Sequence, residues 1–96
     1  MADEKVEQKA QLLEEPVPVK DILIMTILSL EGKAWAYLGL IGHPETQKIK
    51  KDLNEAKLAI DAIDALYKLI EPLLNNEEKK DIQTRLTNLR LNFVKT

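Results

Sequence analysis

The chain contains no cysteine and a single histidine among its 96 residues. The lack of cysteine excludes disulfide frameworks, thiolate zinc sites, iron–sulfur clusters and cysteine nucleophiles. Glycine is also scarce, with three residues, and the sequence contains no Gly-rich phosphate loop, dinucleotide fingerprint or nucleophile elbow. We therefore expect no enzymatic activity, no catalytic residue, no cofactor and no bound metal.

The chain also lacks the strong positive charge that is typical of nucleic-acid-binding proteins. Its formal net charge is −2 and its isoelectric point is about 5.4, which argues against nucleic acid as a bulk electrostatic partner. Hydrophobic residues make up 45% of the chain and charged residues 31%, which is enough apolar material for a packed core. A chain of this length forms one domain.

Residues 1–19 are polar and acidic, with five acidic and two basic side chains, and they end in the sequence Pro16-Val17-Pro18. Prolines at alternate positions favour extended backbone and prevent a helix from continuing through them. We expect a flexible acidic tail over residues 1–19 and a single helical domain over residues 20–96. The start of the chain lacks the apolar stretch of a secretory signal, which, with the absence of cysteine, predicts a cytoplasmic location.

A first helix is predicted over residues 20–39. Apolar side chains recur there at helical spacing, which places one set on a single face: Leu23, Ile27, Leu30, Ala34 and Leu38. Further apolar residues on the other sides indicate burial on more than one side. Gly39 is the residue type that ends helices in the left-handed conformation. Glu31 and Lys33 lie in the middle of this apolar stretch, so we expect no membrane span.

A second helix is predicted over residues 52–71, because Asp52 precedes a glutamate by three residues, the spacing of an N-terminal capping box. Its apolar seam comprises Leu53, Ala56, Ile60, Ile63, Tyr67 and Ile70. Pro72 predicts its end. Asp61 and Asp64 each have a lysine one turn away, which is typical of a solvated, salt-linked face rather than of paired catalytic carboxylates.

A third helix is predicted over residues 76–95, where Asn75 precedes a glutamate in the same capping pattern. Its apolar residues make a single narrow stripe of Ile82, Leu86, Leu89 and Phe93. Arg85 and Arg90 flank this stripe on opposite sides, as long cationic side chains do when they cover the edges of an apolar contact. Leu91 points away from the stripe, which suits either an isolated surface leucine or a subunit contact.

Residues 40–51 are predicted to form a loop, because glycines and the His43-Pro44 turn signal interrupt the helical pattern. A loop of this length in a small helical unit is typically functional or mobile. Its only residues with catalytic or metal-ligating chemistry are His43 and Glu45, and these fall short of the about three or four ligands that a metal site needs. We expect His43 to be a turn histidine.

These elements predict an all-α three-helix unit that packs as a helical dimer. A unit of this size without disulfides rarely gains a large stability margin from one core, and its first two helices carry more apolar surface than two neighbours cover. The first candidate function is a non-enzymatic interaction or self-assembly module, most simply a homodimer, with an unidentified protein as an alternative partner. The predicted interface residues are Ser29, Gly32, Trp35, Ala36, Leu58, Ala62, Ala65, Leu69 and Leu91.

The second candidate function is that of an accessory protein that binds nucleic acid or a small ligand. It would use the 40–51 loop and the basic last helix, since residues 75–96 carry five basic and three acidic side chains. Phosphate contacts would make such binding sensitive to salt. Because Arg85 and Arg90 do not share one helix face, the pattern favours the interaction module.

Several short segments resemble a family of small bacterial helical proteins that is catalogued only as a domain of unknown function. The resemblance lies in Leu38-Gly39-Leu40-Ile41, followed by Pro44-Glu45-Thr46, and in the Leu89-Arg90 and Phe93-Val94 pairs near the C-terminus. It covers residues 20–96 and implies an all-helical, bacterial, cytoplasmic protein, with no activity or cofactor to transfer. Two departures are visible: Gln47 stands where the family typically has glycine, and residues 71–75 replace a Lys- and Gly-containing linker.

Overall fold

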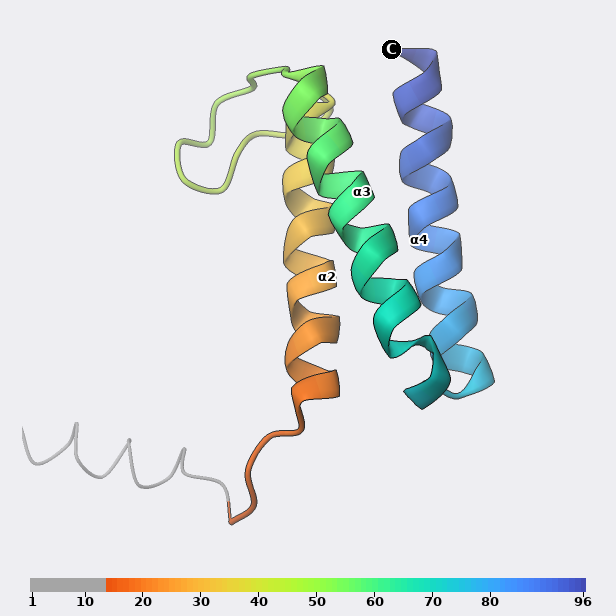
Figure 1. The fold of residues 1–96 in the computed structure, drawn as a ribbon. Coiled ribbons are helices and arrows are strands. Elements are labelled where there is room, and N and C mark those ends of the chain that lie inside the picture. Colours follow the sequence, from red (N-terminus) through yellow and green to blue (C-terminus); the bar gives the residue numbers. More distant parts are fainter. Residues whose placement is uncertain (1–13) are drawn as a thin grey trace, which may run out of the picture.

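Three helices make up the fold of residues 14–96, which are the residues that the computed structural model describes. They are α2 (Val19–Tyr37), α3 (Leu53–Ile70) and α4 (Asn76–Lys95), with the short 3-10 helix η1 (Glu71–Leu73) directly after α3 (Figure 1). This part of the chain contains no β-strand. The predicted all-α three-helix unit is confirmed, and each predicted helix boundary lies within two residues of the observed one.

The predicted acidic tail falls largely outside the described residues, which begin at Glu14. Residues 14–18 are exposed and not helical. Pro18, immediately before α2, has φ −61° and ψ 145°, the extended backbone that a proline at this position favours. Val19, which we assigned to the tail, is the first helical residue.

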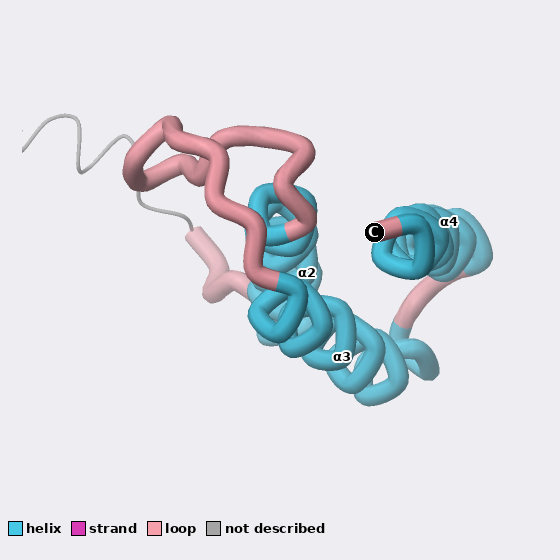
Figure 2. The backbone as a smooth tube through the Cα atoms, turned by 90° about the horizontal axis from the view of Figure 1, so that it is seen from above, coloured by secondary structure: helices cyan, strands magenta, loops and turns pink. Residues whose placement is uncertain are grey.

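The helices run up, down and up, so that neighbours in the chain are antiparallel (Figure 1). α2 and α3 lie directly against each other, whereas α4 lies beside them at a greater distance in both views (Figures 1 and 2). The loop between α2 and α3 projects from the end of the bundle at which α2 stops. Among residues 14–96, no helix has the length and apolar character needed to cross a membrane.

Gly39 ends α2 as predicted. It adopts φ 83°, and its N–H donates to Ala36 O at 2.9 Å while the N–H of Leu40 donates to Trp35 O at 3.3 Å. These two bonds define a Schellman motif, which uses carbonyl groups that the helix leaves without partners. A side chain at this position would be strained by the positive φ, so the turn requires glycine.

Both predicted N-terminal caps are present, and their side chains accept hydrogen bonds from the first N–H groups of α3 and α4. Asp52 accepts hydrogen bonds from the N–H groups of Asn54 and Glu55 at the start of α3. Its own N–H donates to Tyr37 O at 2.8 Å, which ties the start of α3 to the end of α2. At the start of α4, Asn75 and its glutamate partner form the complete reciprocal capping box.

Buried side chains from all three helices form one apolar core. Its members include Ile27, Ala34, Ala56, Ile60, Ile63, Tyr67, Ile70, Ile82, Leu86 and Leu89. The phenol of Tyr67 keeps a polar partner, because its O–H donates to Glu71 Oε2 at 3.2 Å. Burial, followed by this hydrogen bond, raises the pKa of Tyr67. The predicted seam of α3 is therefore the centre of the core.

Ion pairs attach α4 along both edges of its apolar stripe. Arg85 Nη1 lies 2.7 Å from Glu31 Oε1 of α2, and Arg90 Nη2 lies 3.4 Å from Asp64 Oδ1 of α3. The pKa of Asp64 is lowered by its hydrogen bond with Lys68, with a further contribution from the charge of Arg90. The prediction that two arginines cover the edges of the stripe is confirmed.

Candidate functional site

α3 exposes an apolar stripe on the side opposite its buried seam. Leu58 and Leu69 are 64% and 67% exposed. Between them, at helical spacing, lie the half-buried Ala62 and the exposed Ala65. Leaving such side chains in water is unfavourable, since burial of one leucine is worth about 1.5–3 kcal/mol. All four belong to the interface predicted from the sequence, and the structure leaves all four accessible.

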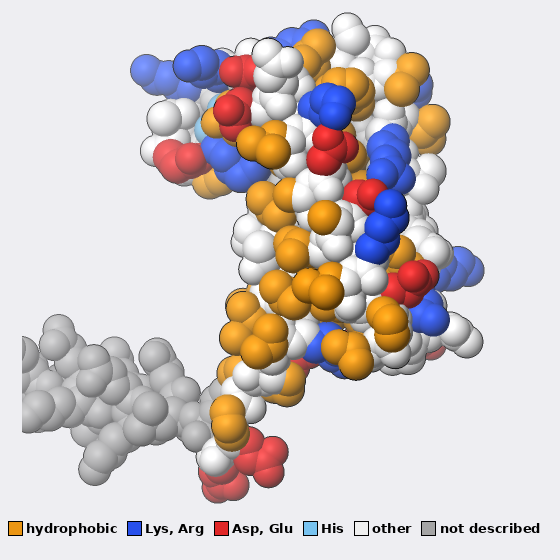
Figure 3. All heavy atoms as spheres, in the orientation of Figure 1, with side chains coloured by type: hydrophobic (Ala, Val, Ile, Leu, Met, Phe, Trp, Pro, Cys, Tyr) orange, Lys and Arg blue, Asp and Glu red, His pale blue; other side chains and the backbone are white. Residues whose placement is uncertain are grey.

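α2 adds a second apolar stripe, formed by Ile22 and Met25, which are 47% and 64% exposed, and by the exposed Ser29. A groove of about 230 Å³ between the helices is lined by Leu30, Lys33, Tyr37, Glu55, Leu58, Ala59 and Ala62. Figure 3 shows hydrophobic side chains gathered over α2 and α3 on one side of the molecule. We define the α2–α3 face as Ile22, Met25, Ser29, Leu58, Ala62, Ala65 and Leu69.

The other four predicted interface residues are not part of the α2–α3 face as defined. Ala36 has no exposed surface, which corrects its assignment to an interface, because its side chain is already covered within one chain. Trp35 packs against the core, and its indole N–H donates to Glu31 Oε2 at 3.4 Å. Gly32 has open space where a Cβ would stand. Leu91 is 54% exposed and lies across α4 from the buried stripe.

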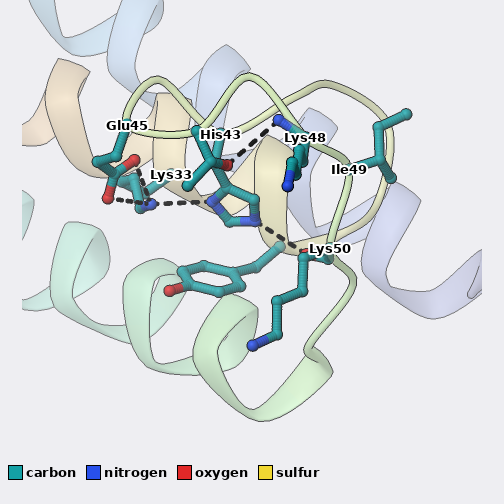
Figure 4. Close-up of a pocket in the computed structure, with 8 residues that line it drawn as sticks. Lys33, His43, Glu45, Lys48, Ile49 and Lys50 are labelled. Carbon is teal, nitrogen blue, oxygen red and sulfur yellow. Dashed lines mark hydrogen bonds and ion pairs between the residues drawn. The ribbon is translucent and has the colours of Figure 1, made fainter.

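The 40–51 loop folds back toward α2 and forms a pocket of about 350 Å³ (Figure 4). The residues that line it are Lys33, Tyr37, His43, Glu45, Thr46, Lys48, Ile49 and Lys50. Backbone hydrogen bonds organise the loop: His43 N–H donates to Lys48 O at 3.0 Å, and Gln47 N–H donates to His43 O at 2.6 Å. The predicted loop therefore has a defined internal structure.

His43 joins the two arms of the loop from a buried position, with 6% of its surface exposed. Its Nε2 lies 2.8 Å from the carbonyl oxygen of Lys50, which can only accept, so this nitrogen carries the ring proton. Nδ1 then accepts a hydrogen bond from Lys33 Nζ at 2.9 Å. The rings of Tyr37 and His43 meet edge to face, with centroids 4.4 Å apart. Both ring nitrogens are engaged, so His43 is a structural residue in this arrangement.

Lys33 connects the loop to α2. Its Nζ lies 2.9 Å from both carboxylate oxygens of Glu45 and 4.8 Å from the centre of the Tyr37 ring. The hydrogen bond from Lys33 lowers the pKa of the Glu45 carboxyl. The Glu45 side chain remains 63% exposed, so solvent screens this ion pair. The cluster therefore holds a carboxylate at the entrance of the pocket.

Position 47, where the resemblance led us to expect glycine, has an unusual backbone conformation. Gln47 adopts φ 58°, the left-handed conformation that glycine accepts without strain. Gly42 approaches it closely, since a Cβ added at Gly42 would lie 2.9 Å from Gln47 O. A residue with a side chain in the left-handed conformation carries a cost of about 1 kcal/mol. Position 47 therefore favours glycine.

The sequence predicted a turn histidine at His43 and an acid too isolated for a metal site at Glu45, and it did not indicate their shared partner, Lys33. No local signal marks this cluster, because Lys33 lies on α2 while the other two lie in the loop. Within residues 14–96, no group of three or more histidine, cysteine, aspartate or glutamate side chains could hold a metal ion. What the pocket offers chemically is positive charge beside a fixed carboxylate.

A family model described as a domain of unknown function (DUF1844) matches residues 20–95. The matched range contains all three helices and the loop. No curated protein and no solved structure matches the chain. Because the family model covers most of the chain, the chain belongs to this family, and the predicted resemblance to a family catalogued only as a domain of unknown function is confirmed.

Proposed function

We propose that this member of the DUF1844 family is a non-enzymatic interaction module that self-associates as a homodimer through the α2–α3 face. The face of one copy packs on the same face of a second copy around a twofold axis. The observation that carries the proposal is the exposure, on the two adjacent helices α2 and α3, of four large apolar side chains: Ile22, Met25, Leu58 and Leu69, between 47% and 67% exposed. The cysteine-free, acidic chain suits the bacterial cytoplasm, which is the location we propose.

Burial of these side chains supplies the free energy of association. Transfer of one large aliphatic side chain from water contributes about 1.5–3 kcal/mol, of which only the still exposed part counts here. A twofold contact uses every residue of the face twice. The total is then of the same size as the cost of association, which is about 4–15 kcal/mol, so we expect a weak dimer whose population rises with protein concentration.

The shape of the face also supports a second copy as the partner. α2 and α3 are antiparallel and adjacent, so they present a two-helix surface (Figure 1). Two such surfaces stacked face to face make a four-helix arrangement with short side chains at its centre. Ser29, Ala62 and Ala65 are the short residues of this face, and they let the helix backbones come close.

Light scattering coupled to size exclusion, over a wide range of protein concentration, tests the proposal. The wild-type chain is expected to reach twice its monomer mass of 10.9 kDa. The double variant Leu58→Glu, Leu69→Glu places two charges in the contact, and we expect it to remain at the monomer mass. Both leucines are exposed in the single chain, so circular dichroism of the variant should show unchanged helix content.

Leu91→Glu is the matched control, because Leu91 is 54% exposed and lies outside the α2–α3 face. We expect this variant to dimerise like the wild type. A wild-type mass that stays at 10.9 kDa at every concentration would contradict the proposal. So would a dimer that survives the double substitution, or one that Leu91→Glu alone dissociates.

A further inference from the structure

The 40–51 loop carries a concentration of positive charge that the proposed dimer does not use. Lys48, Lys50 and Lys51 lie within four consecutive residues, and none of them forms an ion pair with a carboxylate of residues 14–96. Most cations of the helices have such a partner: Lys20, Lys33, Lys57, Lys68, Arg85 and Arg90. The loop is therefore the part of the described chain where an external anion is most clearly favoured.

Two of these three lysines, Lys48 and Lys50, line the pocket, whereas Lys51 is not among its lining residues. Lys33 of α2 lines it as well, and Figure 4 shows Lys33 and Lys48 on opposite sides of the His43 ring. The hydrogen bonds of His43 hold the two arms of the loop in place, so the lysines project from a preformed frame. Ammonium groups around a partly enclosed space attract an anion more strongly than the same groups on an open surface.

Glu45 already shows how an anion sits in this site. Both of its carboxylate oxygens accept hydrogen bonds from Lys33 Nζ at 2.9 Å, although the Glu45 side chain is 63% exposed. Glu45 therefore acts as an internal anion that satisfies one of the three lysines. The ammonium groups of Lys48 and Lys50 remain for a ligand, and displacement of Glu45 would make Lys33 available as well.

The pocket also has room and apolar surface for the rest of a ligand. Its volume of about 350 Å³ falls in the range of small-molecule pockets, which is about 300–1,000 Å³. Tyr37 supplies an aromatic wall, and Ile49 is 67% exposed at the pocket edge. A compact molecule with one acidic end and a less polar body fits this combination.

We propose that the loop pocket binds a small molecule bearing a phosphate or carboxylate group, with Lys48 and Lys50 holding the anion and Glu45 competing for Lys33. The site does not continue into a nucleic-acid surface, because the arginines of α4, Arg85 and Arg90, are held in ion pairs with α2 and α3. The pocket belongs to one chain, so the proposal is independent of the dimer.

NMR titration of the full-length chain with pyrophosphate, at constant ionic strength, tests the site, with citrate as the carboxylate probe. We expect saturable shifts of the amide signals of residues 43–51. The variant Lys48→Ala, Lys50→Ala should bind about tenfold more weakly, because it lacks both charges that hold the anion. The matched control Lys79→Ala, Lys80→Ala removes two adjacent lysines of α4 and should change the affinity less than about twofold.

Glu45→Gln provides the second arm, and Glu77→Gln on α4 is its control for net charge. We expect Glu45→Gln to bind pyrophosphate several-fold more tightly than the control, because the internal competitor is neutralised. If pyrophosphate binds more tightly than citrate, the acidic group of the ligand is a phosphate, and if citrate binds more tightly, it is a carboxylate. Saturable binding of either probe supports the site. The proposal is overturned if no probe gives saturable shifts, if both lysine pairs weaken binding equally, or if Glu45→Gln weakens it.

Discussion

α2 and α4 meet α3 in different ways, although all three helices share one core. The loop from Leu38 to Asp52 separates α2 from α3, yet these helices pack directly against each other. Only η1 and a short turn separate α3 from α4, yet α4 lies farther away (Figures 1 and 2). The width of the apolar face, and not the length of the connection, therefore sets how closely two helices pack.

The same difference appears on the outer surface. α2 and α3 are apolar over most of their circumference, so the side that faces away from the core still carries Ile22, Met25, Leu58 and Leu69. α4 has one buried stripe with Arg85 and Arg90 at its edges. The apolar surplus is the surface that the proposed dimer would cover, whereas the charged edges complete a contact within the chain.

The largest effect is expected in the core that both contacts share. Ile63, at the centre of the α3 seam, is 1% exposed. Ile63→Ala should lower the free energy of unfolding by about 2–5 kcal/mol, because it leaves a cavity where all three helices meet. Urea denaturation measures the change. Leu91→Ala, on the outside of α4, should stay within about 0.5 kcal/mol, and an equal loss would show that α4 is not packed as described.

A smaller effect is expected at the edge of α4. Hydrogen bonds to Asp81 and Glu31 raise the pKa of Arg85, so this arginine remains charged and paired. Glu31→Ala removes the α2 partner of Arg85 and the acceptor of the Trp35 indole. We expect a loss of about 1 kcal/mol in the free energy of unfolding, limited because the Arg85 side chain is 37% exposed and screened by solvent.

A double-mutant cycle with Arg85→Met separates the ion pair from the packing of the two side chains. The coupling between Glu31→Ala and Arg85→Met should be measurable at low salt and should shrink as salt is added. If the losses in unfolding free energy of the two single variants simply add in the double variant, apolar packing alone attaches α4. The contact of α4 would then not differ in kind from the apolar contact between α2 and α3.

The smallest effect is expected in the long loop. Gln47→Gly relieves the left-handed backbone strain at φ 58°, and we expect a gain of about 0.5–1 kcal/mol in the free energy of unfolding. Thermal denaturation measures the gain. Gln47→Ala keeps the Cβ and should bring no comparable gain. If both variants were equally stable, the strain would not come from the Cβ.

Local features were predictable from the sequence because they depend on neighbouring residues. The caps at Asp52 and Asn75, the stop at Gly39 and the end of α3 near Pro72 all follow from hydrogen bonds or steric limits within a few positions of the chain. The apolar stripe of α4 and its flanking arginines were equally predictable, because helical periodicity determines which side chains share one face of the helix.

The candidate sites were predictable only in part. Periodicity identified the outward stripe of α3, since Leu58, Ala62, Ala65 and Leu69 recur at helical spacing. It placed Ala36 in the same kind of surface, although this side chain has no exposure. Trp35 was also predicted at the interface, but it packs against the core. A helix wheel gives the direction of a side chain and does not show what covers it.

The sequence by itself determined the three helices, their ends and the amount of apolar surface on each, because these properties arise from short-range hydrogen bonds and side-chain periodicity. Only the tertiary structure decided which surface stays exposed and how the 40–51 loop is held. In this loop, His43 accepts one hydrogen bond from Lys33 of α2 and donates another to the carbonyl oxygen of Lys50. Such contacts form only after the chain has folded back on itself, so no local pattern records them.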